Sequence, residues 1–175
     1  MTGAPHTGDA AEVQVRTATI ADAEATLEIY NREVLGSTVT FDLVPRSLAD
    51  QQAWLERRGG VHLALVAVDP SGMVVGFGSL SPYRDRPAYA TTVEDSVYVH
   101  HAHHGQGVGK ALLSALVSRA ADHGFHAVMA RIVGGHEASI ALHRSVGFEI
   151  VGTEREVGRK FGQWLDVVSM QLLLT

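Results

Sequence analysis

The sequence predicts a mixed α/β fold, in which helices flank a central β-sheet within a single domain. The chain has 175 residues, the length of one ordinary domain. Apolar residues make up 46% of it and charged residues 19%, which is a globular composition. Segments with strand periodicity alternate with segments that carry an apolar helical stripe. We therefore expect one domain over residues 13–175, preceded by a small, polar and disordered tail over residues 1–12.

The first part of the chain predicts a strand followed by a helix. Apolar and polar residues alternate over 13–18, which indicates a strand. Thr19 and Asp22 have the spacing of a capping box, so a helix should begin behind them and end at Gly36. The next residues, 36–42, are rich in β-branched side chains, and they either cap a cleft or form a short edge strand.

The remaining sequence predicts a second helix and the rest of the sheet. Ser47 and Asp50 repeat the capping signal, and Gly59-Gly60 closes that helix. Asp69-Pro70-Ser71-Gly72 is a strong turn signal for a hairpin. The expected elements are strands at 62–68, 73–80 and 91–99, a helix from the turn at 104–109 to Gly124, a strand at 126–133, a helix at 137–146, and strands at 148–153 and 164–173. The order β-α-α-β-β-β-α-β-α-β-β indicates a mixed sheet with a crossover helix between neighbouring parallel strands.

Charge and cysteine content exclude several classes of function. The formal net charge is −5 and the chain has no basic run, which argues against nucleic-acid binding. Because the chain has no cysteine, disulfides, thiolate zinc sites and cysteine nucleophiles are excluded. The histidines of 100–104 lack an acidic or cysteine partner at ligand spacing, so we expect no metal. Without a run of ~20 apolar residues or a signal-peptide core, we expect a cytoplasmic protein that binds no membrane.

A glycine-rich turn between a strand and a helix carries the strongest functional signal. Gly105, Gly107 and Gly109 alternate before the helix, so the main chain can approach a ligand closely. Free N–H groups and the positive end of the helix dipole favour an anion there. The spacing differs from the dinucleotide motif, and Ala111 after Lys110 differs from a P-loop. A pyrophosphate fits this turn; a glycine-rich helix entry without a ligand is the alternative.

Several motifs resemble the GCN5-related N-acetyltransferase (GNAT) superfamily. Its acetyl-CoA signature is (Gln/Arg)-x-x-Gly-x-(Gly/Ala) between a strand and a helix; Gly107 and Gly109 match the glycines, whereas His104 departs from the first position. Over almost the whole chain the resemblance is closer to the phosphinothricin acetyltransferase-like branch. The segments that carry it are 29–31, 37–41, 94–99, 141–148 and 158–167. The resemblance implies the GNAT fold and direct transfer of acetyl from acetyl-CoA to a primary amine.

The resemblance also implies where acetyl-CoA binds. The pantetheine amides should lie against the backbone of Val97 and Val99, and the pyrophosphate should meet the N–H groups of the glycine-rich turn. His136 stands where the family usually has an asparagine that contacts the cofactor. The expected cofactor-binding residues are Val97, Val99, Gly105, Gln106, Gly107, Val108, Gly109, Lys110 and His136.

Two residues are expected to be catalytic, Glu94 and His143. Strand period two places Glu94, Ser96 and Tyr98 on one face. Glu94 matches the family's general base; an exposed strand glutamate is the alternative, and a bulge would turn Asp95 toward the cleft instead. His143 stands where many superfamily members have tyrosine. We expect it to orient the reactants or to hydrogen-bond the developing oxyanion.

The resemblance further implies an acidic amino-acid acceptor. Arg84, Arg86 and Tyr89 stand where the family binds it, and Phe41 lines the pocket; an exposed loop is the alternative for the two arginines. We expect acetylation of phosphinothricin-like compounds, including methionine sulfoximine or sulfone, and hence herbicide resistance. The rivals are a CoA-binding regulatory module without turnover and an acetyltransferase for a protein N-terminus or another amine. Because family members are commonly homodimers, we expect a homodimer.

Overall fold

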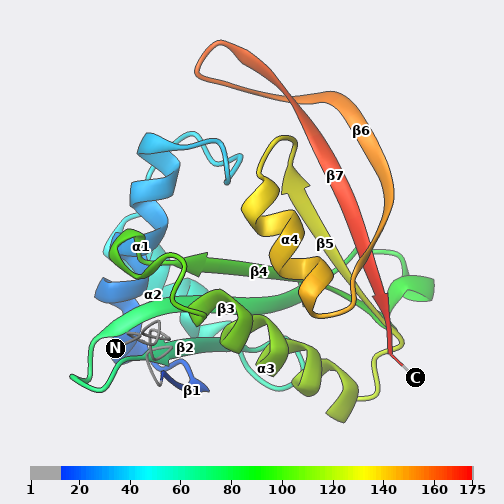
Figure 1. The fold of residues 1–175 in the computed structure, drawn as a ribbon. Helices are drawn as coiled ribbons and strands as arrows, with labels where there is room; N and C mark the ends of the chain where they lie inside the picture. The colour runs from blue at the N-terminus through cyan, green and yellow to red at the C-terminus, as the bar shows by residue number, and fades with distance from the viewer. Residues whose placement is uncertain (1–12, 175) are drawn as a thin grey trace, which may run out of the picture.

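A seven-stranded mixed sheet organises residues 13–174, which the computed structural model describes (Figure 1). The predicted tail over 1–12 lies outside them. In chain order the elements are β1 (Gln14–Thr17), α1 (Ala23–Gly36), α2 (Leu48–Glu56), β2 (Ala64–Val68), β3 (Val74–Pro82), β4 (Thr92–Val99), α3 (Val108–Asp122), β5 (Ala127–Val133), α4 (Glu137–Ser145), β6 (Glu149–Lys160) and β7 (Gln163–Leu173). The strand order is β1-β2-β3-β4-β5-β7-β6. As predicted, α3 crosses over between two parallel neighbours, β4 and β5.

Both predicted capping boxes are present. The Thr19 N–H donates to the Asp22 carboxylate at 2.8 Å, ahead of the short 3-10 helix that leads into α1. At the start of α2, the Asp50 N–H donates to the Ser47 hydroxyl at 3.1 Å. The helix α2 ends at Glu56, before the predicted stop at Gly59-Gly60. The N–H of its C-cap residue, Arg57, donates to the carbonyls of Ala53 and Leu55 in the last turn. None of the helices within residues 13–174 is long and apolar enough to cross a membrane.

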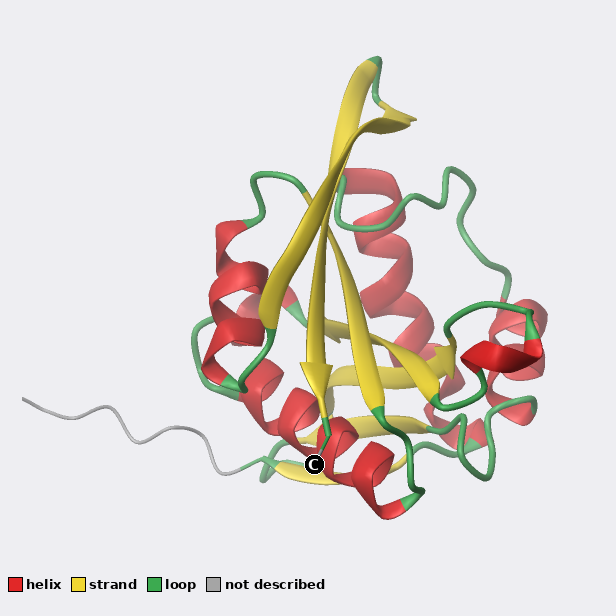
Figure 2. Ribbon diagram, turned by 90° about the vertical axis from the view of Figure 1, so that its right-hand side faces the viewer, coloured by secondary structure: helices red, strands yellow, loops and turns green. Residues whose placement is uncertain are grey.

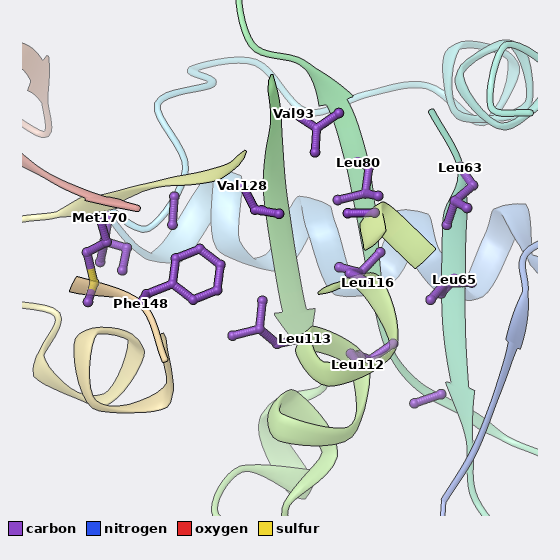
Figure 3. Packing of buried hydrophobic residues seen from close by; sticks show 14 of the residues in the cluster. Leu63, Leu65, Leu80, Val93, Leu112, Leu113, Leu116, Val128, Phe148 and Met170 are labelled. Atoms are coloured by element: carbon purple, nitrogen blue, oxygen red, sulfur yellow. The ribbon is translucent and has the colours of Figure 1, made fainter. Parts of the chain in front are cut away.

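The core lies on both faces of the sheet. One face is covered by α3 and α4, whereas α1 and α2 cover the other (Figures 1 and 2). The apolar stripe of α3 packs against strand residues such as Leu80 and Val128 (Figure 3). The fully buried stripe residues are Leu112, Leu113, Leu116 and Ala120. Burying each leucine contributes roughly 1.5–3 kcal/mol, so the stripe fixes α3 and the turn before it on the sheet.

The strands β4 and β5 pair only at their first ends. Residues 92–94 align with residues 127–129, and the pairing stops there. The main-chain groups of residues 95–99 that face β5 therefore have no strand partner. The sheet is split along this line, and the split is the structural origin of the site described below.

Two segments differ from the sequence expectation. In the segment 36–42, residue 36 ends α1 and residues 37–42 form bends and irregular backbone without a strand, so of the two alternatives only the cleft-capping one remains. The strand β6 runs to Lys160, well beyond its predicted end at 153, and forms with β7 a long hairpin that projects from the sheet (Figure 2). Nearly all of β6 is exposed, so it lacks the apolar alternation by which a strand is recognised.

Candidate active site

The split between β4 and β5 opens into a cavity of about 650 Å³. Side chains alternate along β4, so Glu94 lies on the same face as Tyr98, which packs against Tyr30 of α1. Asp95 lies on the opposite face, toward α4. Both carboxylates line the cavity, which therefore connects the two faces of the sheet. The pairing of β3 with β4 is regular, so no bulge exchanges the roles of Glu94 and Asp95.

Most of the predicted site residues meet at this cavity. They are Phe41, Glu94, Val97, Val99, Gly105, Gly107, Val108, Gly109, Lys110, His136 and His143. Gln106 does not line it, because its side chain donates to the Ala102 carbonyl at 3.1 Å. Arg84, Arg86 and Tyr89 also lie outside the lining, exposed on the loop before β4. The guanidinium of Arg84 lies over an aromatic ring of its own loop, 4.9 Å from the ring centre.

The glycine-rich turn has the geometry of an anion cradle. Gly105 and Gly107 have φ values of 74° and 83°, the left-handed region that favours glycine. Gly107 is the N-cap of α3, so the first N–H groups of the helix, at residues 108–110, have no partner within it. With the unpaired β4 edge at residues 95–99, this turn fits a long ligand that carries both amides and a pyrophosphate, as acetyl-CoA does.

His104 and His136, which depart from the family pattern, both lie at the cavity. The Nε2 of His104 donates to the Val99 carbonyl at 3.0 Å, which ties the glycine-rich turn to the end of β4. His136 is the N-cap of α4, and burial lowers its pKa. Its imidazole is therefore neutral at pH 7 and can either donate to a ligand or accept from it.

Glu94 is a half-buried carboxylate that lines the cavity. Burial raises its pKa, against the opposing charge of Arg131. Arg131, which the sequence analysis missed, lines the cavity, and its guanidinium lies 2.9 Å from the Glu154 carboxylate. The missed signal was a single charged residue within the apolar strand β5.

Asp95 and His143 form a buried pair in the wall of the cavity. The carbonyl of Ser139 lies 2.7 Å from His143 Nδ1 and can only accept, so Nδ1 carries a proton. The Nε2 atom lies 3.1 Å from Asp95 Oδ2. Burial acts to lower the pKa of His143, but the hydrogen bond and charge of Asp95 outweigh it and the pKa is raised. The second carboxylate oxygen of Asp95 is buried without a partner among residues 13–174.

A sequence model of the acetyltransferase (GNAT) family matches residues 24–148. The chain belongs to the GNAT acetyltransferase family. It is 44% identical to an L-methionine sulfoximine/L-methionine sulfone acetyltransferase of Pseudomonas aeruginosa, over 91% of this chain and 94% of that protein. A phosphinothricin N-acetyltransferase of Streptomyces coelicolor is 40% identical, over 90% of this chain and 94% of that protein.

Solved structures of GNAT proteins agree with the fold. A phosphinothricin acetyltransferase of Sinorhizobium meliloti, solved with acetyl-CoA, is 40% identical and superposes with a TM-score of 0.89, over 93% of this chain and 88% of that one. The predicted family, branch and α/β fold are thereby confirmed. This GNAT protein is an acetyltransferase that uses acetyl-CoA, whose thioester bond breaks as the acetyl group is transferred.

Replacing Gly107 by Ala should weaken acetyl-CoA binding about tenfold. The left-handed φ of 83° costs an alanine roughly 1–2 kcal/mol, so the turn would relax and its N–H groups would rotate. Gly124→Ala is a matched control, because Gly124 has a φ of 76° and open space around it, and it lies beyond the opposite end of α3. Isothermal titration of both variants checks this. Equal acetyl-CoA affinities would contradict the cradle.

Proposed function

We propose that this GNAT enzyme acetylates the α-amino group of small amino acids related to methionine sulfoximine, methionine sulfone or phosphinothricin. The observation that carries the proposal is the half-buried Glu94, which lines the same cavity as the glycine-rich turn. The likeness to acetyltransferases named for these compounds supports the same acceptor class.

We assign the removal of a proton from the acceptor to Glu94. An α-amino group has a pKa near 8 in peptides and a higher one in free amino acids, so most of it is protonated at pH 7. Only the neutral amine attacks a thioester. The raised pKa of Glu94 brings the carboxylate closer to the pKa of the amine, which favours proton transfer directly or through one water.

We assign an orienting role to His143. Both ring nitrogens are engaged by Ser139 and Asp95, so the ring is held in one position. The raised pKa favours the protonated ring, in which Nε2 donates to the Asp95 carboxylate. The unpartnered oxygen of Asp95 is available to accept from a bound water or a ligand N–H.

On the acceptor side, Phe41 supplies an apolar wall and Arg131 a positive charge. The guanidinium of Arg131 forms a salt bridge with the carboxylate of Glu154, and its remaining N–H groups can donate to a carboxylate of the acceptor. The roles of Arg84, Arg86 and Tyr89 in acceptor binding stay predictions. The expected homodimer is also part of this proposal; exposed apolar side chains on the hairpin, such as Val157 and Trp164, are consistent with an interface there.

A substrate panel tests the proposed function. Thiol release from acetyl-CoA would be measured as kcat/KM with methionine sulfone, methionine sulfoximine, phosphinothricin, the common amino acids and short N-terminal peptides. We expect the sulfone, sulfoximine or phosphinothricin to give the highest value. Preference for a peptide would favour an N-terminal acetyltransferase, and tight acetyl-CoA binding without turnover would favour a regulatory module.

A further inference from the structure

The buried lysine of the β6–β7 hairpin makes an unusual long-range contact. Lys160 is 3% exposed and forms no salt bridge with any of residues 13–174. Its Nζ donates to the carbonyl of Thr40 at 2.8 Å and lies 3.5 Å from the carbonyl of Glu33. Glu33 is in the last turn of α1, where the negative end of the helix dipole favours a cation. The hairpin thus holds both the end of α1 and the segment that caps the cavity.

A second contact joins the same two segments two residues earlier on the hairpin. The ring of Phe41 lies directly on the backbone of Gly158: a Cβ placed there would overlap Cε2 of the ring and would lie 2.8 Å from Cδ2. Phe41 lines the cavity and Gly158 does not, so the ring lies between the hairpin and the cavity. The absence of a side chain at 158 therefore sets how far the ring retracts.

The shape of the hairpin brings Gly158 and Lys160 to this place. The pairing of β6 with β7 shifts between Glu154 and Gly158, and the Glu156 N–H in this bulge donates to Asp166 at 2.8 Å. A bulge bends a strand and re-aims the residues that follow it. Figure 1 shows the hairpin rising past α4 toward the loop after α1. The hairpin tip is therefore a fixed support for residues 39–41.

We propose that Gly158 and Lys160 are positioning residues that set acceptor specificity: Lys160 fixes the segment 39–41, and Gly158 lets the Phe41 ring retract to admit longer acceptor side chains. The proposal rests on the proposed function, since it concerns the amino-acid acceptor of the same site. Neither residue contacts the acceptor directly; both act through the position of Phe41.

Gly158→Ala should narrow the acceptor side of the cavity. The added methyl group pushes the ring of Phe41 away from the hairpin and into the cavity. The kcat/KM for methionine sulfone should fall about tenfold relative to that for a short acceptor such as alanine, because one methyl group is worth roughly this much in a tight pocket. Acetyl-CoA affinity should be unchanged.

Gly152→Ala is the matched control, because an added Cβ at Gly152 on the same strand meets nothing within 4 Å. In a Phe41→Ala background, Gly158→Ala should leave the ratio of kcat/KM for methionine sulfone to kcat/KM for alanine unchanged, since the ring that it displaces is gone. The role of Gly158 would be overturned if this kcat/KM ratio stayed the same in Gly158→Ala alone. It would also be overturned if the ratio changed equally in Gly152→Ala.

Lys160→Met tests the other half of the proposal. Loss of the ammonium should raise the acceptor KM severalfold with little change in kcat, and should speed hydrogen exchange of the amides at residues 37–42. Arg159→Met is the control, since Arg159 is exposed and lies against Trp164. Unchanged KM and exchange in Lys160→Met would overturn its role.

If the wild type acetylates no amino acid, the proposed function fails. If it does acetylate amino acids and the variants behave as their controls, only the positioning role of Gly158 and Lys160 fails.

Discussion

Glu94→Gln is expected to lower kcat for the amino-acid acceptor by about 10²–10⁴ and to leave the acetyl-CoA Kd unchanged. Glutamine keeps the size of the side chain but accepts no proton at the pH of the reaction. Glu94 is far from the glycine-rich turn along β4, so cofactor binding should not respond. Steady-state kinetics with methionine sulfone, together with isothermal titration of acetyl-CoA, measure the two quantities.

The pH dependence of kcat/KM provides a second test of the role of Glu94 with the same variant. Burial raises the pKa of Glu94, so the acid limb of kcat/KM in the wild type should lie above the usual carboxyl range near 4.3. In Glu94→Gln that limb should vanish. Glu149→Gln, an exposed change at the start of β6, is the control. A Glu94→Gln enzyme with the wild-type rate at neutral pH would remove Glu94 from the mechanism.

His143→Ala is expected to cost about 3–5 kcal/mol of unfolding free energy, the usual effect of removing one partner from a buried ion pair. The Asp95 side chain is 1% exposed, so its carboxylate would remain buried without its charge partner. Urea unfolding of the two proteins measures the difference. The double variant Asp95→Asn, His143→Gln should lose less than the two single variants summed, because it leaves no buried charge behind.

The same pair predicts how stability depends on pH. The folded pKa of His143 is raised above its ordinary value of 6.5. Its contribution is therefore complete below about pH 6.5 and is lost as the pH rises through the folded pKa. The stability gap between the wild type and His143→Ala should be larger at about pH 6 than at about pH 9. A gap that is constant or grows with pH would contradict the charged pair.

Local signals predicted the parts of the fold that depend on neighbouring residues. The capping boxes at Thr19 and Ser47 locate α1 and α2, because a cap is satisfied within one helical turn. Alternation along β4 placed Glu94 and Asp95 on opposite faces, since the strand is regular. Gly107 marked the cradle because its φ of 83° is one that few other residues adopt.

Contacts between distant segments could not be predicted in this way. Asp95 and His143 are 48 positions apart, and only the packing of α4 over the split sheet brings them together. The loop after β3 carries Arg84 outside the cavity, whereas Arg131 lines it from within an apolar strand. The support of Phe41 by Gly158 depends on a bulge, which sequence periodicity does not show.

We infer that the unpaired N–H groups at the start of α3 hold the pyrophosphate of acetyl-CoA, so that the thioester reaches the acceptor through the split sheet. Titration of the isotope-labelled full chain with acetyl-CoA, followed by the amide resonances, tests it most directly. We expect the largest shifts at residues 105–110, with smaller ones at 95–99. Saturable binding that leaves the amides of 105–110 unshifted would contradict it.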